Sequence, residues 1–288
     1  MKDKLCFVQF MHPGGEHRPG RDGFKGWNSG PHGRKFMLSK GRYKSDGKAH
    51  AGMLVFWGEW EPPSRLIFRF HDPKPSGPRF LFEPYFVSLP PDSGFQNTDP
   101  FVFGDRFLYT GCLQHTKRGY TQLRYLARGS VILFGSCVRS RFALDTVFVV
   151  EDHIDHSADD YRDHIRDRVP ADYMPVTMEP WYASPKHQGQ SHRLYFGATH
   201  RHPIEGMFSF VPCLPAAEAP QRFARPTIKL PGVVQPLLTQ GKKLNPQPNL
   251  PEVRKLWDVV VDQVLAQDLS LGFRVELPKR LATHSKNR

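Results

Sequence analysis

Three strings in the first quarter of the chain carry side chains suited to proton transfer, phosphate binding or the stacking of a base. The first, His12-Pro13-Gly14-Gly15-Glu16-His17, directly follows an apolar stretch over 5–11 that predicts a strand. Imidazoles and carboxylates transfer protons, and glycines let backbone N–H groups approach a phosphate. We therefore take His12, Glu16 and His17 as candidate catalytic residues, and Gly14 and Gly15 as candidate phosphate contacts. A sharp turn with solvated polar groups explains the same string without any function.

The second string, Gly30-Pro31-His32-Gly33-Arg34-Lys35, predicts a basic turn that enters a strand. A guanidinium group can hold a phosphate through two parallel hydrogen bonds, and an ammonium group binds it as a point charge. Arg34 and Lys35 are therefore candidate substrate-binding residues, together with the nearby Trp27, Asn28 and His32. An ordinary basic turn is the alternative.

The third string, residues 56–65, places two indoles beside two carboxylates at a predicted strand end. Pro62-Pro63 must interrupt a sheet ladder there. An indole can stack on a base while a carboxylate accepts a hydrogen bond from its amine or ring N–H. Candidate substrate-binding residues here are Trp57, Glu59, Trp60, Glu61 and Arg65. The alternative is a tryptophan pair that covers the core beside solvated glutamates.

Weaker candidates lie further along the chain. Asp99 and Gln114 are substrate-binding candidates by residue type alone, and Cys112 is better explained as a buried thiol than as a nucleophile. Residues 199–206 contain a second His-Pro turn with a glutamate, so His202 and Glu205 could join His12 and Glu16 in one cleft, although chance similarity explains them too. No HExxH or CxxC spacing occurs, so we predict no metal site and leave any cofactor unknown.

The charge balance points to a polyanionic partner. Forty Lys and Arg residues against 28 Asp and Glu residues give a net charge of +12, spread along the whole chain. Such a surface attracts nucleic acid or nucleotides, although charge that serves only solubility remains the alternative. We find neither an apolar run long enough for a transmembrane helix nor an apolar leader, and the four cysteines are widely spaced. We therefore expect no membrane partner and a cytoplasmic location; the oligomeric state stays open.

Apolar runs broken by Gly and Pro predict an α+β protein that is rich in β-structure. We expect a curled or barrel-like mixed sheet with a few peripheral helices, one of them a C-terminal amphipathic helix over 251–269. The domain boundaries that we expect are a β-rich site domain over 1–150, a β-leaning extension over 151–230 that can belong to the same domain, a linker over 231–250, and a helix with a basic tail over 251–288.

Two family resemblances accompany these patterns. Residues 126–136 and 144–150 resemble the paired strands of PUA-like barrels, the superfamily that includes ASCH and EVE domains, which implies a β-barrel that binds RNA, DNA or a modified base. Over about the first 150 residues, the chain also resembles bacterial and phage nucleotide-modification-associated domains. The strings that carry this second resemblance are His12-Pro13-Gly14, Arg34-Lys35-Phe36, Gly58-Glu59-Trp60-Glu61-Pro62, Asp99-Pro100-Phe101-Val102-Phe103-Gly104 and residues 129–135.

Three functions remain open from the sequence. The first is a nucleotide- or nucleic-acid-associated protein in DNA base modification or its processing, in which an aromatic pocket holds a flipped base. The second is a non-catalytic PUA-like reader of modified bases or RNA, and the third is a metal-dependent nuclease-like effector. Whether the protein is an enzyme is undecided; convergence of His12, Glu16 and His17 on the end of the 56–61 strand would favour catalysis.

Overall fold

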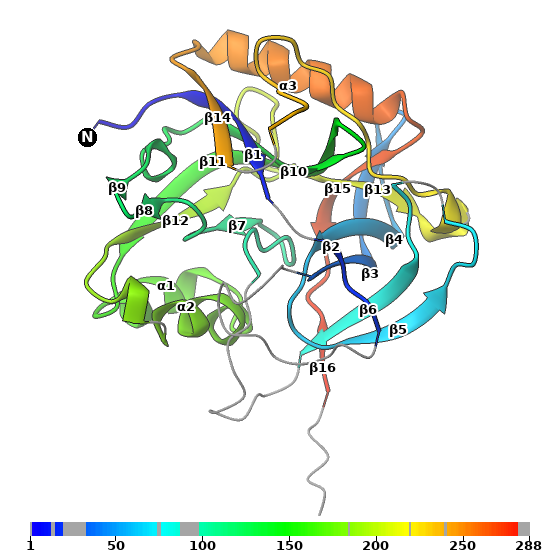
Figure 1. The fold of residues 1–288 in the computed structure, drawn as a ribbon, viewed down its shortest axis with the longest axis horizontal. Helices are drawn as coiled ribbons and strands as arrows, with labels where there is room; N and C mark the ends of the chain where they lie inside the picture. Colours follow the sequence, from blue (N-terminus) through cyan, green and yellow to red (C-terminus); the bar gives the residue numbers. More distant parts are fainter. Residues whose placement is uncertain are drawn as a thin grey trace, which may run out of the picture.

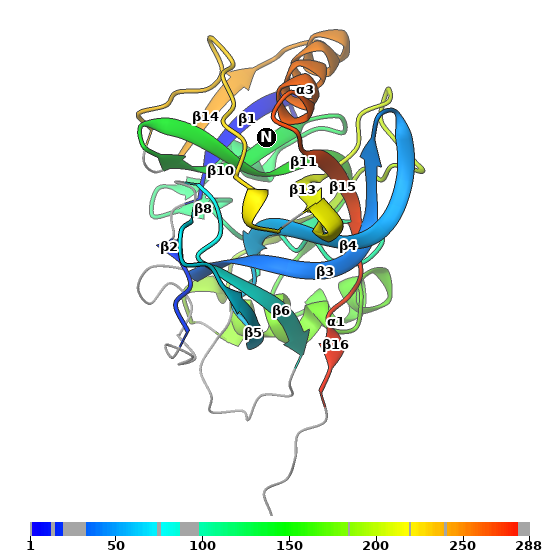
Figure 2. The same ribbon diagram turned by 90° about the vertical axis from the view of Figure 1, so that its right-hand side faces the viewer.

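The structure is a computed structural model that describes residues 2–12, 15–19, 33–73, 76–86, 98–183, 185–218, 220–238 and 241–281. Within these residues the chain is β-rich, with two large mixed sheets and few helices, as the sequence predicts. Figure 1 shows the two sheets side by side, and Figure 2 looks at the molecule from the side of the second sheet, with β3 (Gly33–Ser45), β4 (Lys48–Glu59), β5 (Ser64–Arg69) and β6 (Phe80–Phe86) in front.

The first sheet has six strands in the order β14-β1-β10-β11-β12-β7. Their bounds are β1 Cys6–Met11, β7 Leu108–Tyr109, β10 Val131–Val138, β11 Arg141–His156, β12 His192–Gly197 and β14 Gly241–Pro246. β1 pairs in parallel with β10 and antiparallel with β14, and all six of its residues are buried. A strand covered on both faces needs an almost continuous apolar sequence, which explains the run over 5–11.

The second sheet follows the order β15-β13-β4-β3-β6-β16, with β2 beside β3 and β5 beside β6. Its strands are β2 Gly15–Glu16, β3 Gly33–Ser45, β4 Lys48–Glu59, β5 Ser64–Arg69, β6 Phe80–Phe86, β13 Val211–Pro215, β15 Ser270–Val275 and β16 Lys279–Arg280. Because β15 pairs with both β13 and β3, the strands β3, β4, β13 and β15 close into a ring. This ring is the curled part of the sheet that the sequence predicts. A small separate hairpin joins β8 His115–Thr116 to β9 Gly119–Tyr120.

The β3–β4 hairpin turns at Asp46-Gly47, where both residues have positive φ angles of 49° and 74°. Two such residues form the kind of turn whose twist matches that of the flanking strands, and Asp-Gly is one of the pairs that adopt it readily. The hairpin register places Arg34 directly opposite Glu59. The turn therefore fixes which side chains meet at the far end of the hairpin.

The helices are short except for α3, which spans Leu250–Leu265. Asn249 and Glu252 cap its start reciprocally, and the apolar face includes the buried Val253, Trp257 and Val260. In Figure 1 this helix runs across the top of the fold. The remaining helical segments are α1 Tyr161–Ile165, α2 Glu179–Ala183, one π-helical segment at Met174–Met178, and 3-10 turns at Gln122–Arg124, Arg166–Arg168, Pro185–His187, Ala216–Glu218 and Pro220–Arg222.

Two regions differ from the expected organisation. Residues 241–246, inside the segment that we expected to be a linker, form β14 and pair with β1. α3 ends at Leu265 rather than at residue 269, and the chain then returns to the second sheet as β15. After the helix, the chain therefore forms a strand of the second sheet before it reaches its basic end. Among the described residues, no helix is long and apolar enough to span a bilayer.

Candidate functional site

His12, Arg34 and Glu59 meet between the two sheets. His12 follows β1 in the first sheet, whereas Arg34 and Glu59 face each other on β3 and β4 in the second. Nε2 of His12 lies 3.2 Å from Oε2 of Glu59, and Nη2 of Arg34 donates to the same oxygen at 3.0 Å. One of the three predicted proton-transfer residues, His12, thus contacts one of the two glutamates predicted in the third string.

This cluster is withdrawn from water. The side chains of Arg34 and Glu59 are each 1% exposed, and that of His12 is 5% exposed. Removing an ion pair from water costs several kcal/mol per charge, which the interaction between the partners must offset. Nη1 of Arg34 is also buried and makes no hydrogen bond within the described part of the chain. The charges of Arg34 and Glu59 balance each other, and Arg34 keeps one N–H group without a partner among the described residues.

Cys112 borders the cluster, with its Sγ 3.7 Å from Nε2 of His12. Burial raises the pKa of its thiol well above the usual value, and the nearby Asp99 and Glu59 carboxylates add to the rise. The thiol is therefore protonated at neutral pH, which fits a structural cysteine better than a nucleophile.

Asp99 holds the loop that carries Cys112. Its two carboxylate oxygens accept the backbone N–H groups of Thr110 and Cys112 at 2.8 and 3.0 Å. Burial nevertheless raises the pKa of Asp99 from 3.8 to about 7, with these two hydrogen bonds acting against the rise. Asp99, which we proposed as a substrate contact, uses both oxygens within the protein.

A second buried ion pair, between Asp145 and Arg225, lies beside Trp57. Nε of Arg225 donates to Asp145 at 2.9 Å, and its guanidinium carbon lies 4.7 Å from the centre of the Trp57 ring. Burial raises the pKa of Asp145, while Arg225 and then Arg34 oppose the rise. The two ion pairs are therefore electrostatically linked. Neither Asp145 nor Arg225 was predicted as a site residue, although a carboxylate inside the apolar run over 142–150 was a signal for Asp145.

The two tryptophans of the third string belong to the core. Trp57 is 4% exposed and packs on Phe36, with ring centres 4.5 Å apart. Trp60 is 0% exposed, packs against Phe86 and Phe103, and donates its indole N–H to the Pro63 carbonyl. Neither ring has a face open to a stacking base in this conformation.

The other basic and acidic residues of the second and third strings also bind within the protein or lie at its surface. Lys35 donates to the Pro62 carbonyl at 2.7 Å and to the Ser64 hydroxyl at 3.1 Å. Glu61 is half-buried just beyond Trp60. Arg65 lies on the exposed strand β5, where it forms an ion pair with Glu83.

Glu16 and His17 lie at the β2 edge of the second sheet. Glu16 accepts hydrogen bonds from the backbone N–H groups of Arg79 and Phe80 at 2.8 and 2.9 Å. Burial raises the pKa of its carboxyl group, although these two hydrogen bonds act to lower it. The His17 backbone N–H donates to the Arg34 carbonyl, and its ring packs on Phe82. Gly15 is exposed in β2. Gly14, Trp27, Asn28 and His32, the remaining predicted contacts, lie outside the described residues.

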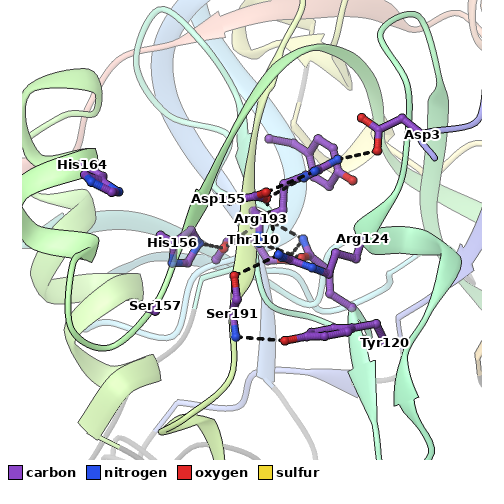
Figure 3. A network of polar contacts seen from close by, with 12 residues as sticks. Asp3, Thr110, Tyr120, Arg124, Asp155, His156, Ser157, His164, Ser191 and Arg193 are labelled. Atoms are coloured by element: carbon purple, nitrogen blue, oxygen red, sulfur yellow. Dashed lines mark hydrogen bonds and ion pairs between the residues drawn. The ribbon is translucent and has the colours of Figure 1, made fainter. Parts of the chain in front are cut away.

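Gln114 belongs to a separate polar network. Its amide donates to the carbonyls of Thr110 and Arg193 and accepts the Arg193 backbone N–H, so it ties a loop to β12. Figure 3 shows the Arg193 side chain between Asp155 and Asp3, with bonds of 2.8 and 2.9 Å. In the same view, Thr110 lies 2.9 Å from Nε2 of the buried His156. This network joins the start of the chain to β11 and β12.

The second His-Pro motif lies elsewhere. Thr199, His200, Arg201 and His202 line a pocket with Arg42 and Phe273, and neither His12 nor Glu16 belongs to that lining. Glu205 occupies the adjacent turn, where its carbonyl accepts from Arg254. Among the described residues, no group of three or more His, Cys, Asp or Glu side chains could hold a metal ion.

No protein-family model, no curated protein and no solved structure matches the chain.

Proposed function

We propose that the protein acts on nucleotides or nucleic-acid bases, in DNA base modification or its processing, with His12 as the residue that transfers protons. The observation that carries this proposal is the contact between His12 and Glu59 across the two sheets. A carboxylate beside an imidazole orients the ring and stabilises its protonated form. Arg34, at the same carboxylate, would offer its unused N–H group to a negatively charged oxygen.

The proposal also rests on the resemblance to nucleotide-modification-associated domains. His12, Arg34 and Glu59 come from three of the strings that carry it, and both His12 and Arg34 contact Glu59. Asp99, from a fourth string, fixes the Cys112 loop beside them. The ring of β3, β4, β13 and β15 supports the expectation of a barrel-like, PUA-related fold. The four cysteines are free thiols, which supports the expected cytoplasmic location.

The test compares base mass before and after incubation with the protein. Matched single- and double-stranded oligonucleotides, with and without modified bases, are incubated with the purified protein and analysed by mass spectrometry. We expect a change in base mass that His12→Ala abolishes and that His164→Ala, an exposed histidine on α1, leaves intact. Unchanged base mass with every substrate, or equal activity of the two variants, would contradict the proposal.

A non-catalytic reader of modified bases or RNA is the second candidate. The observation that favours it is the burial of His12, which is 4% exposed as a residue and in direct contact with a buried ion pair. Under this second candidate, His12 serves structure and contacts no substrate. Binding of a modified oligonucleotide with no change in mass would support the reader over the enzyme.

A further inference from the structure

A half-open pocket with a volume of about 790 Å³ lies apart from the His12 cluster. Its walls come from β3, β15, the 104–108 segment, residues 167–170 and the loop after β12. The volume falls within the range of small-molecule and nucleotide sites, roughly 300–1,000 Å³. Its lining includes five arginines, namely Arg42, Arg106, Arg168, Arg201 and Arg274.

The lining also contains the carboxylates of Asp105, Asp167 and Glu276, and three of the five arginines are in ion pairs. Arg106 pairs with Glu151 at 3.0 Å, Arg168 pairs with Asp152 at 3.4 Å, and Arg274 pairs with Asp105. Among the described residues, Arg42 and Arg201 have no carboxylate within ion-pair distance. These two guanidinium groups are thus available to an anion.

Two stacked rings lie beside these charges. The half-buried His200 imidazole lies flat on the buried Phe273 ring, with centres 4.3 Å apart and an angle of 17° between the planes. The Arg42 guanidinium lies 5.9 Å from the centre of the same Phe273 ring. Burial lowers the pKa of His200, and Lys44 and Arg42 add to the shift, so the imidazole is neutral at pH 7. A flat, oriented ring beside arginines that have no carboxylate partner suits a ligand that has both a flat base and a phosphate.

We propose that this pocket binds single-stranded nucleic acid, with phosphates at Arg42 and Arg201 and a base stacked on His200. Proteins that bind single strands combine backbone-tracking cations with aromatic rings in this way. The half-open shape suits a strand that passes through the pocket better than a ligand that must be enclosed. The proposal concerns a second site and does not depend on chemistry at His12.

The test measures binding of a fluorescently labelled strand of ten thymidines over a series of salt concentrations. Each phosphate contact to a single strand contributes roughly −0.7 to the slope of log K against log salt concentration. We therefore expect R42Q/R201Q to flatten the slope by about 1.4 and to weaken binding at least tenfold at low salt. The matched control, R118Q/R139Q, removes two exposed arginines that lie outside the pocket lining and should change both quantities much less.

The His200 variants test the stacking contact separately. His200→Ala should weaken binding of the thymidine strand about tenfold, whereas His200→Phe, which keeps a flat ring, should restore it. Both should bind an abasic strand of equal length as the native protein does. Equal weakening by R42Q/R201Q and the control would overturn the proposal, as would strand affinity no better than that of thymidine monophosphate. His12→Ala should leave this binding intact, so a failure here is distinguishable from a failure at His12.

Discussion

Arg34 and Glu59 face each other on β3 and β4, and their ion pair is 1% exposed on both sides. The pair owes its position to the Asp46-Gly47 turn at the other end of the hairpin, because that turn sets the register. It also joins the two sheets, since Glu59 receives His12 from the first sheet. One carboxylate thus links the candidate catalytic histidine to the framework.

Replacing Glu59 should therefore be costly for folding. Glu59→Gln leaves the Arg34 charge buried without its counter-ion, which we expect to lower the free energy of unfolding by about 3–5 kcal/mol. The measurement is urea denaturation at pH 7. Glu83→Gln, which removes the partner of the exposed Arg65, is the control and should cost about 0–1 kcal/mol. Equal losses of unfolding free energy in the two variants would show that the buried pair contributes no more to stability than the exposed one.

Asp99 should make stability depend on pH. Because its pKa is raised from 3.8 to about 7, the folded protein holds a proton between these values that the unfolded chain releases. The contribution of Asp99 to stability is therefore greatest below about pH 4 and declines by about 1.4 kcal/mol per pH unit until about pH 7.

Asp99→Asn tests this dependence because asparagine does not titrate. As the pH rises from 4 to 7, the unfolding free energy of the native protein should fall relative to that of Asp99→Asn. Urea denaturation at each pH measures it. A difference that stays constant, or that moves in favour of the native protein, would contradict a raised pKa.

His192 should make the folded protein less stable as the pH falls, which is the opposite of the effect of Asp99. It is fully buried, and neither ring nitrogen has a hydrogen-bond partner in the described structure. Burial, and then His187, lower its pKa from 6.5 to about 3. Between these values the unfolded chain binds a proton that the folded protein does not, so stability falls by about 1.4 kcal/mol per unit as the pH decreases.

His192→Phe removes this titration and the two unsatisfied nitrogens. The unfolding free energy of the variant minus that of the native protein should be about 2 kcal/mol larger at pH 5 than at pH 7. Thermal and urea unfolding at both pH values measure this difference, with the exposed His164→Phe as the control. A relative stability that is the same at both pH values would show that His192 does not resist protonation.

The sequence predicted local features better than long-range ones. The apolar run over 5–11 predicted β1, and residue chemistry picked His12, Arg34 and Glu59, which the structure brings together. The Asp46-Gly47 pair carried an unused signal for the longest hairpin. Nothing local indicated that β14, from a Pro- and Asn-rich segment, would pair with β1. Such pairing depends on the whole sheet.

Aromatic residues were the main source of misplaced expectations. Trp57 and Trp60 sit beside carboxylates in the sequence, which resembles a binding pocket, yet both rings pack in the core. The aromatic pair that borders a pocket is instead His200 and Phe273, which are 73 residues apart in the sequence. Residues 101–109 are rich in phenylalanine, yet only Leu108–Tyr109 forms a strand there, because the chain turns back at Gly104, where φ is +92°.

The positive charges of the pocket should affect the pKa of His200. Lys44 and Arg42 are the charged groups that, after burial, lower its pKa. Arg42→Gln removes one of them, so the His200 pKa should move upward toward 6.5, as followed by NMR of ring-labelled histidine. Arg118→Gln, outside the pocket lining, should leave the titration as it is.

Adding the thymidine strand should raise the His200 pKa as well, because nearby phosphates favour the protonated ring. Binding of the strand should then become tighter as the pH falls through the pKa of His200. A titration insensitive to both Arg42→Gln and the strand would place the imidazole away from the charges that define the pocket.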